Sequence, residues 1–154
     1  MRPPYIVAIL VLVSLLLVAM YGGNDSKEDI ANVTIRDRVF TVDIMDDDAE
    51  RAQGLSGRET LRQDEGMLFL MGVRTQPIFW MKEMRFPLDI IWIDGEMIVD
   101  ISENVPAPTS PIDEIARVQP SSLADKVLEI NAGEASKSGF TVGDIVTFQG
   151  ITLK

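Results

Sequence analysis

Residues 88–93 constrain the fold most, because they form a run that is apolar on both faces of an extended strand. Successive side chains of a strand point to opposite faces, and here Asp89 is the one polar exception. Such a strand belongs in the middle of a sheet that is covered on both sides. The turn signal Asp94-Gly95 follows at once, and it predicts an antiparallel pairing of residues 88–93 with residues 96–102.

Other short β-type runs alternate with turn residues along the chain. Residues 32–36 and 38–45 flank a polar turn at Asp37 and predict a hairpin. Carboxylates at 46–48 suit the start of a short helix that runs through Gln53 and stops at Gly54. Further strands are predicted at 66–71, 78–82, 126–130 and 144–148, with a short helix within 131–138. This pattern predicts a mainly β domain, either a compact barrel-like fold or a sandwich, with one or two short helices.

The segment from residue 103 to residue 122 has no periodicity and contains Pro106, Pro108, Pro111 and Pro120. Proline cannot donate a ladder hydrogen bond, so this segment cannot be an interior strand. We expect a long surface loop, which is either a binding loop or a plain exposed connection.

The first 23 residues are a hydrophobic segment that precedes the fold. Residues 6–20 are apolar except for Ser14, a length between that of a signal-peptide core and that of a spanning helix. A signal anchor and a cleaved signal peptide both remain open, with the anchor favoured. Arg2 lies before this run and acidic residues follow it, so the domain is expected outside the cytoplasm. The expected product is a single-pass membrane protein, or a secreted one if the segment is cleaved.

This assignment divides the chain into residues 1–23 as anchor or signal peptide, 24–31 as a polar tether, and 32–154 as a single β-rich domain.

A formal net charge of −10 disfavours nucleic acid as a partner. The chain contains no cysteine and no histidine, which removes thiol chemistry and the commonest transition-metal ligand. We therefore expect neither a metal site nor a cofactor.

Several short motifs, in order along the chain, resemble family 192 of the domains of unknown function. They are Arg51-Ala52-Gln53-Gly54-Leu55-Ser56-Gly57-Arg58, Asp64-Glu65-Gly66-Met67-Leu68-Phe69, Phe79-Trp80-Met81-Lys82, Leu88-Asp89-Ile90-Ile91, Val127-Leu128-Glu129-Ile130-Asn131-Ala132-Gly133 and Gly143-Asp144. The resemblance implies a compact, barrel-like β fold found in bacterial and archaeal proteins that are often exported. It implies no established activity, substrate or cofactor.

Two positions depart from the family's pattern. Ser56 stands where the family usually has methionine, and Glu83-Met84 stands where asparagine and threonine usually follow Trp-Met-Lys. If these positions line a pocket, its contents differ in this chain.

The polar residues within these motifs are the candidate ligand-binding residues: Arg51, Arg58, Glu65, Trp80, Lys82 and Asp89. Trp80 and Lys82 are two residues apart, so they point to the same side of a strand and would suit an anionic or sugar-like ligand. Arg51 and Arg58 flank a glycine-rich turn and offer planar donors for a carboxylate or phosphate.

Each of these residues also has a purely structural interpretation. Either arginine can pair with Asp64, Glu65 or Asp89 to fix the loop to the barrel. Large aromatic residues in apolar strands usually belong to the core, which is the expectation for Trp80 and Trp92.

The predicted role is binding, either of a small polar or anionic ligand or of a partner protein of the cell envelope. The alternative is a hydrolase of an envelope saccharide that uses a carboxyl pair among Glu65, Asp89 and Glu129. Calcium at residues 46–48 is a further alternative, but no EF-hand spacing follows and helix capping explains the carboxylates.

Overall fold

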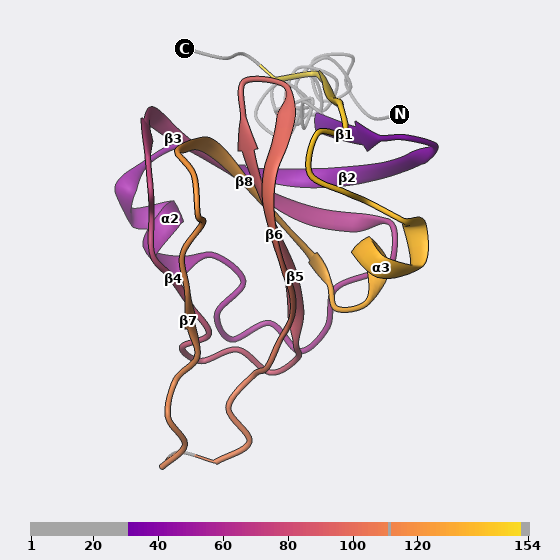
Figure 1. The fold of residues 1–154 in the computed structure, drawn as a ribbon. Helices are drawn as coiled ribbons and strands as arrows, with labels where there is room; N and C mark the ends of the chain where they lie inside the picture. The colour runs from indigo at the N-terminus through magenta and orange to yellow at the C-terminus, as the bar shows by residue number, and fades with distance from the viewer. Residues whose placement is uncertain (1–30, 111, 152–154) are drawn as a thin grey trace, which may run out of the picture.

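The computed structural model describes residues 31–110 and 112–151 of the 154-residue chain (Figure 1). The predicted anchor or signal peptide lies outside these residues, as does the predicted tether except for Ala31, which is the first residue of strand β1. Among the residues described, no helix is both long enough and apolar enough to cross a membrane. The described part is mainly β with two short helices, α2 (Asp48–Gln53) and α3 (Glu134–Ser138), as predicted.

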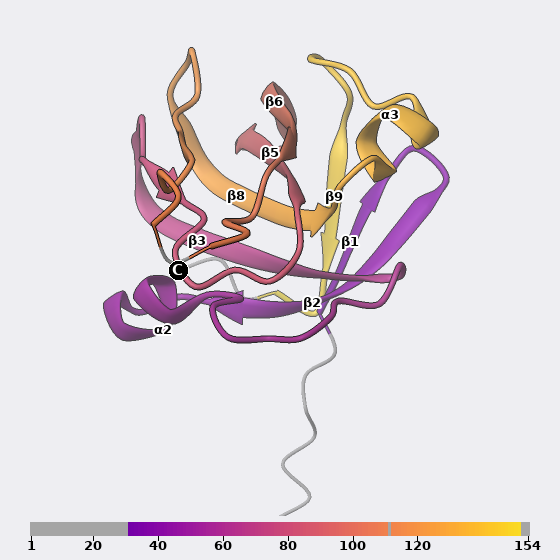
Figure 2. The same cartoon turned by 90° about the horizontal axis from the view of Figure 1, so that it is seen from below.

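The main sheet has seven strands in the order β6-β5-β8-β3-β2-β1-β9 and curls into a half-barrel (Figures 1 and 2). Its strands are β1 (Ala31–Ile35), β2 (Arg38–Met45), β3 (Glu65–Thr75), β5 (Leu88–Asp94), β6 (Met97–Val105), β8 (Ala124–Asn131) and β9 (Val146–Gln149). Neighbouring strands are antiparallel except β2 and β3, which run parallel. Parallel strands need a crossover, which α2 and the loop after it supply.

The two edges of the sheet meet at one end, where the start of β6 approaches the segment before β9. The backbone N–H of Ile98 donates to Asp144 (3.0 Å), and Gly143 donates to the carbonyl of Ile98 (2.9 Å). Val146 donates to the carbonyl of Glu96 (2.9 Å). These hydrogen bonds close one end of the half-barrel. The fold thus agrees with the barrel-like alternative that the sequence predicts.

Strand β5 is buried on both faces, as its sequence predicts. On one face, Ile91 and Ile93 join the hydrophobic core that contains Ala135 of α3, here called the α3-side core. On the other face, Leu88, Ile90 and Trp92 join the core against which Phe79 packs, here called the β4-side core. The candidate site lies over the second of these cores.

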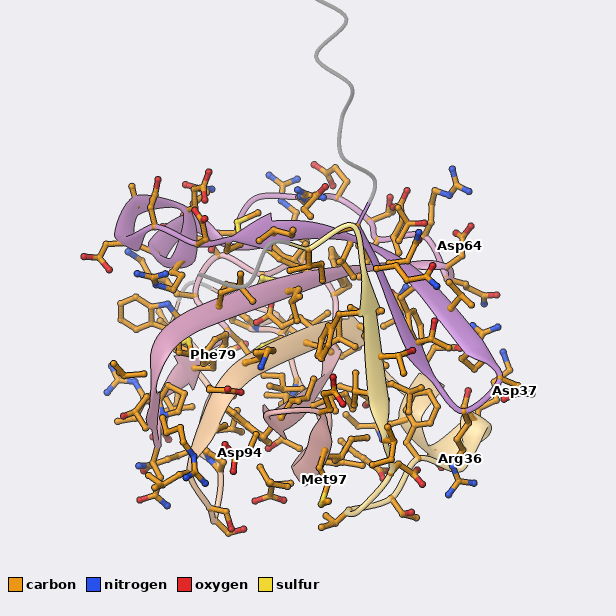
Figure 3. All side chains as sticks on the ribbon, turned by 90° about the horizontal axis from the view of Figure 1, so that it is seen from above. Arg36, Asp37, Asp64, Phe79, Asp94 and Met97 are labelled. Carbon is orange, nitrogen blue, oxygen red and sulfur yellow. The ribbon has the colours of Figure 1, made fainter. Side chains whose placement is uncertain are left out.

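Most predicted elements are present near their predicted bounds. Strands β1 and β2 form the expected hairpin, whose turn places Arg36 at a φ of 54° beside Asp37 at the periphery (Figure 3). Asp47 caps α2 by accepting the N–H of Glu50 (2.8 Å), which confirms capping as the role of that carboxylate. Strands β5 and β6 pair antiparallel across the Asp94-Gly95 turn.

The segment from 103 to 122 is only partly the loop that its prolines predict. Strand β6 continues to Val105, and two residues form strand β7 (Arg117–Val118). Strand β7 pairs antiparallel with β4 (Phe79–Trp80) in a separate two-stranded sheet, seen beside the main sheet in Figure 1. The prediction of a loop was wrong at Arg117 and Val118. No proline lies between residues 112 and 119, so the backbone there can donate hydrogen bonds, and a strand in a two-stranded sheet needs a partner on one side only.

Candidate ligand-binding site around Trp80

Strand β4 sends its side chains alternately into the protein and to the surface. Phe79 points inward (Figure 3), where its ring meets Phe69 at 4.9 Å and Trp92 at 5.4 Å between centroids, both edge to face. Trp80 points outward, and 49% of it is exposed, whereas Trp92 is fully buried. The expectation of a core position is therefore correct for Trp92 and wrong for Trp80. The reason is that β4 lies in a surface ribbon with one face on the core.

Two cationic side chains lie against the Trp80 ring. Lys82 Nζ is 5.8 Å from the ring centroid, on the side that the two-residue alternation predicts. The guanidinium carbon of Arg117, which pairs with Trp80 across the β4–β7 ribbon, is 6.0 Å from the same centroid. Cations at this distance are attracted by the negative face of an indole ring.

Arg117 differs from the other cations of the protein. Among the arginines and lysines that the structure describes, it alone has no described carboxylate within 4.0 Å. Lys82 has only a loose pair with Glu83 at 3.6 Å, and both side chains are largely exposed. The surface around Trp80 therefore carries two cations of which, within the described residues, one has no ion pair and the other a weak one.

The glycine-rich loop after α2 is tied to the segment that follows Trp80. The Ser56 hydroxyl donates to the carbonyl of Lys82 (3.0 Å), and the backbone N–H of Gly57 donates to Glu83 (3.0 Å). Gly54 has a φ of 47°, and a β-carbon there would lie 3.3 Å from the Phe69 ring. The loop thus passes close over the β4-side core, where a larger residue at Gly54 would not fit without movement.

A small cavity of about 30 Å³ lies between this loop and β4. Its lining includes Arg51, Ser56, Phe69, Phe79, Trp80 and Glu129. Glu129 comes from β8, where it lies between Met67 of β3 and Ile90 of β5. These neighbours are apolar, so Glu129 lies among hydrophobic side chains where β8 lines the cavity.

Glu129 is 5% exposed, and its carboxyl makes no hydrogen bond or ion pair with any residue that the structure describes. Burial raises the pKa of Glu129 to about 8, because a carboxylate loses its hydration in this apolar surrounding. At neutral pH the group is therefore mostly an uncharged carboxylic acid, which can donate its O–H as well as accept. A buried acid without a protein partner, in a cavity, is a candidate functional group.

Four of the predicted site residues, Arg51, Arg58, Glu65 and Asp89, bond to the protein itself. Arg51 donates to the carbonyl of Leu70 (2.9 Å) and pairs with Asp48 (2.6 Å), although its side chain also lines the cavity. The Arg58 guanidinium pairs with Asp43 (2.6 Å). Both arginines thus have structural partners, which are different from the predicted partners Asp64, Glu65 and Asp89.

Glu65 lies at the start of β3, where its carboxylate accepts the backbone N–H of Arg62 (3.3 Å). The guanidinium of Arg62 lies 3.5 Å from the same carboxylate. Glu65 is not among the residues that line the cavity.

Asp89 lies on the opposite face of the sheet from Glu129. It is fully buried on the side of Ile91 and the α3-side core, and it pairs in register with Ile130. Its carboxylate accepts the backbone N–H of Asn104 (2.8 Å) and that of Ala135 at the start of α3 (2.9 Å). Asp89 is therefore placed to hold a loop and a helix, and the sheet separates it from Glu129.

The structure thus brings together Trp80, Lys82 and Arg51, and adds Arg117 and Glu129 to them. Sequence reasoning considered Glu129 only as a member of a carboxyl pair, although a lone acid inside the apolar run Val127-Leu128-Glu129-Ile130 was a visible signal. Nothing in the sequence singled out Arg117, because its place opposite Trp80 depends on a tertiary pairing.

Three larger hollows lie elsewhere on the described surface. The largest of them, of about 680 Å³, is open and is lined by Arg117 together with Asp113 and Glu114. One, of about 380 Å³, is lined by Arg74 and Lys126, but these cations pair with Asp94 and Asp125. Another, of about 400 Å³, is open and adjoins Lys82. Within residues 31–110 and 112–151, no group of three or more acidic side chains could hold a metal ion. In the small cavity, the unpaired acid Glu129 lies with the paired cation Arg51, whereas Lys82 and Arg117 lie against Trp80 outside the lining.

Residues 31–148 match the sequence profile of the DUF192 family, which is described as "Uncharacterized ACR". A protein of unknown function from Novosphingobium aromaticivorans is 34% identical, with 76% of this chain and 82% of that chain covered and a TM-score of 0.65. A proposed transcription regulator from Sinorhizobium meliloti is 30% identical, with 79% and 93% covered and a TM-score of 0.68. No curated protein matches this chain. The chain belongs to the DUF192 family.

Proposed function

We propose that this protein is a membrane-tethered, extracytoplasmic domain that binds a small anionic ligand on the surface formed by Trp80, Lys82 and Arg117. The observation that carries the proposal is the position of Arg117, the one described cation without a carboxylate partner, against a half-exposed tryptophan. The chain has a net charge of −10, and Asp113 and Glu114 line the same open hollow as Arg117, yet no described carboxylate lies within 4.0 Å of its guanidinium. Its donors remain available to a ligand.

The chemistry of the three side chains fits a ligand with both a flat or apolar face and a negative charge. An indole ring offers a large stacking surface at small cost in conformational entropy. A guanidinium offers a planar set of donors that matches an oxyanion. Membrane tethering and outward orientation rest on the apolar segment of residues 1–23 and its flanking charges.

The hydrolase alternative has less support. Glycoside hydrolysis normally requires two carboxyl groups on either side of the scissile bond. Glu129 is the one carboxylic acid among the described residues that line the cavity, and Asp89 faces the other way. Binding is thus favoured over hydrolysis.

Tryptophan fluorescence tests the proposal, because Trp80 is exposed and the other tryptophan, Trp92, is buried and bonded to Ser102. The full-length chain in neutral detergent is titrated with D-glucuronate, glucose 6-phosphate and D-glucose. We expect the anions to change the emission of Trp80 at pH 7 and neutral glucose to do so less or not at all. The signal should disappear in Trp80→Phe.

Arg117→Gln should weaken anion binding about tenfold or more, because a hydrogen bond to a charged group contributes roughly 1.5–3 kcal/mol. Arg62→Gln is the matched control, since Arg62 is also exposed but pairs with Asp64. Equal affinities in these two variants, or no binding of any of the probes, would contradict the proposal.

A further inference from the structure

The lining of the cavity includes a polar group that the binding surface alone does not explain. Glu129 is almost completely buried, lines the same cavity as Trp80, and has no hydrogen-bond partner among the described residues. Buried polar groups in proteins are nearly always hydrogen-bonded, so an unpaired one facing a cavity points to a partner that arrives from outside.

The space available limits what that partner is. A cavity of about 30 Å³ holds about one water-sized group, so only the end of a ligand can enter it. The rest of the ligand must lie outside, where the half-exposed ring of Trp80 offers a surface. A planar carboxylate suits this narrow space better than a tetrahedral phosphate with its additional oxygens.

We propose, on the basis of the function proposed above, that the ligand is a small organic acid whose carboxylate enters the cavity and accepts a hydrogen bond from the protonated carboxyl of Glu129. Arg51 is the cation that lines the cavity, and Arg117 and Lys82 would add positive charge beside the part of the ligand that lies on Trp80. Because Glu129 must keep its proton to donate this bond, the protein binds its ligand at neutral pH and releases it in alkali.

The charges around Glu129 are few. From α2, the lining residue Arg51 is the one other ionisable group, and its guanidinium bonds to Asp48 and to the carbonyl of Leu70. Lys82, two residues after the end of β4, lies against the Trp80 ring and is not among the residues that line the cavity. Strand β5 presents Ile90 to Glu129, and β3 presents Met67.

On the same face of β3, the nearest acid is Glu65, which is bonded to Arg62. No opposite charge is therefore placed to hold Glu129 ionised. This agrees with a pKa raised by burial alone.

The proton decides the affinity for an anion. With its proton, Glu129 donates to a carboxylate oxygen as a neutral group. Without it, two negative charges would meet in an apolar cavity, where like charges repel strongly. Affinity should therefore be constant below about pH 7 and fall tenfold for each pH unit above about 8, where the protonated fraction falls tenfold.

The test compares D-glucuronate with D-glucose, which share a sugar ring and differ at the carboxylate. Their dissociation constants for the full-length chain are measured by Trp80 fluorescence between pH 6 and pH 9.5. Glu129→Gln is the matched variant, because an amide keeps the shape and a donor but cannot lose a proton. We expect glucuronate binding to weaken in alkali in the parent protein and to be independent of pH in Glu129→Gln.

A second readout is proton uptake. At pH 9, calorimetry in buffers of different ionisation enthalpy should show nearly one proton taken up per glucuronate bound by the parent protein, and none by Glu129→Gln. A role of Glu129 in folding alone would not produce this uptake.

The outcomes separate the two proposals. If neither glucuronate nor glucose 6-phosphate changes the Trp80 emission in either protein at any pH, the proposed function fails. If glucuronate binds with the same pH dependence in both proteins and without proton uptake, the proposed function stands and the role of Glu129 is overturned. Tighter binding of glucose 6-phosphate than of glucuronate would overturn the carboxylate as the ligand class.

Discussion

Asp89 joins two segments that are distant in the sequence. Its carboxylate accepts one N–H from Asn104, which has a left-handed φ of 52°, and another from Ala135 in the first turn of α3. Both bonds use a buried acceptor that is fully shielded from water. Asp89 is therefore a structural residue by its contacts, and its position inside an otherwise apolar strand is explained.

We predict that Asp89→Asn lowers the free energy of unfolding by about 1–3 kcal/mol, because an amide can accept only through its oxygen and leaves one buried N–H unpaired. Urea unfolding measures the change. Asp43→Asn, which removes an exposed pair with Arg58, should cost less than about 1 kcal/mol. Equal effects of the two substitutions would show that Asp89 does not hold these segments.

Glu83 occupies a backbone position that suits asparagine better than glutamate. Its φ is 59°, in the left-handed region that asparagine tolerates and other residues with a β-carbon avoid. The DUF192 pattern usually has asparagine here, so this chain departs from the family at a conformationally demanding position. Its carbonyl still accepts the N–H of Gly57, which keeps the loop in place.

We predict that Glu83→Asn raises the free energy of unfolding by up to about 1 kcal/mol, since the backbone cost falls and the exposed pair with Lys82 contributes little. Thermal and urea unfolding both measure this gain. Glu114→Asn, at an exposed loop position with no left-handed φ, should change stability by less than about 0.5 kcal/mol. A loss of stability in Glu83→Asn would contradict this interpretation.

At the scale of elements, β3 and β8 approach each other unusually closely at Gly66. A β-carbon on Gly66 would lie 2.9 Å from the carbonyl oxygen of Glu129 and 3.1 Å from Leu128. Because β8 carries Glu129, this contact links the packing of the sheet to the bottom of the cavity. Glycine is needed at position 66 because a β-carbon would have no room there. Its backbone conformation does not require glycine, since its φ is not in the left-handed region.

We predict that Gly66→Ala displaces β8, costs about 1–3 kcal/mol, and speeds amide hydrogen exchange along β8. Gly72→Ala is the control in the same strand, because its β-carbon would meet nothing within 4 Å and its cost arises from a φ of 72°. The control should leave exchange in β8 unchanged. Faster exchange in β8 in both variants would refute the packing argument.

The sequence predicted the elements that local patterns specify. The β1–β2 hairpin, the capped helix α2 and the two-sided strand β5 all follow from turn residues, capping carboxylates and apolar alternation. The parallel pairing of β2 with β3 and the β4–β7 ribbon were not predicted, because both join segments with no local signal for their partner. The same limit applies to the site. The alternation of side chains along a strand predicted that Lys82 lies beside Trp80. The position of Arg117 beside the same ring depends on the pairing of β4 with β7, which the sequence did not predict.

At the scale of the whole molecule, the pH dependence of stability reflects two opposite kinds of carboxyl group. Hydrogen bonds from Arg36 lower the pKa of Asp144, and those from Arg62 lower the pKa of Asp64. Their contributions are lost as the pH falls below about 3.8, since the unfolded chain then binds more protons. Burial raises the pKa of Glu129 from 4.5 to about 8, so the folded state binds more protons between these values.

We therefore predict that stability is greatest near pH 4–5 and declines toward pH 8–9, by at most about 5 kcal/mol from Glu129, because each pKa unit corresponds to 1.36 kcal/mol. Urea unfolding from pH 3 to pH 9 measures the profile. Glu129→Gln should remove the alkaline decline and leave the acid limb unchanged. An alkaline decline of the same size in Glu129→Gln would assign it to other groups.

The central claim is that an uncharged Glu129 meets the anionic end of a ligand beneath Trp80, and a nuclear magnetic resonance titration of the Glu129 carboxyl carbon tests it most directly. The titration is run on the full-length chain with and without saturating D-glucuronate. We predict a pKa of about 8 in the free protein and a higher pKa in the complex, because a ligand that binds the protonated form stabilises it. A carboxyl that titrates near 4.5, or whose pKa is the same in both samples, would contradict the claim.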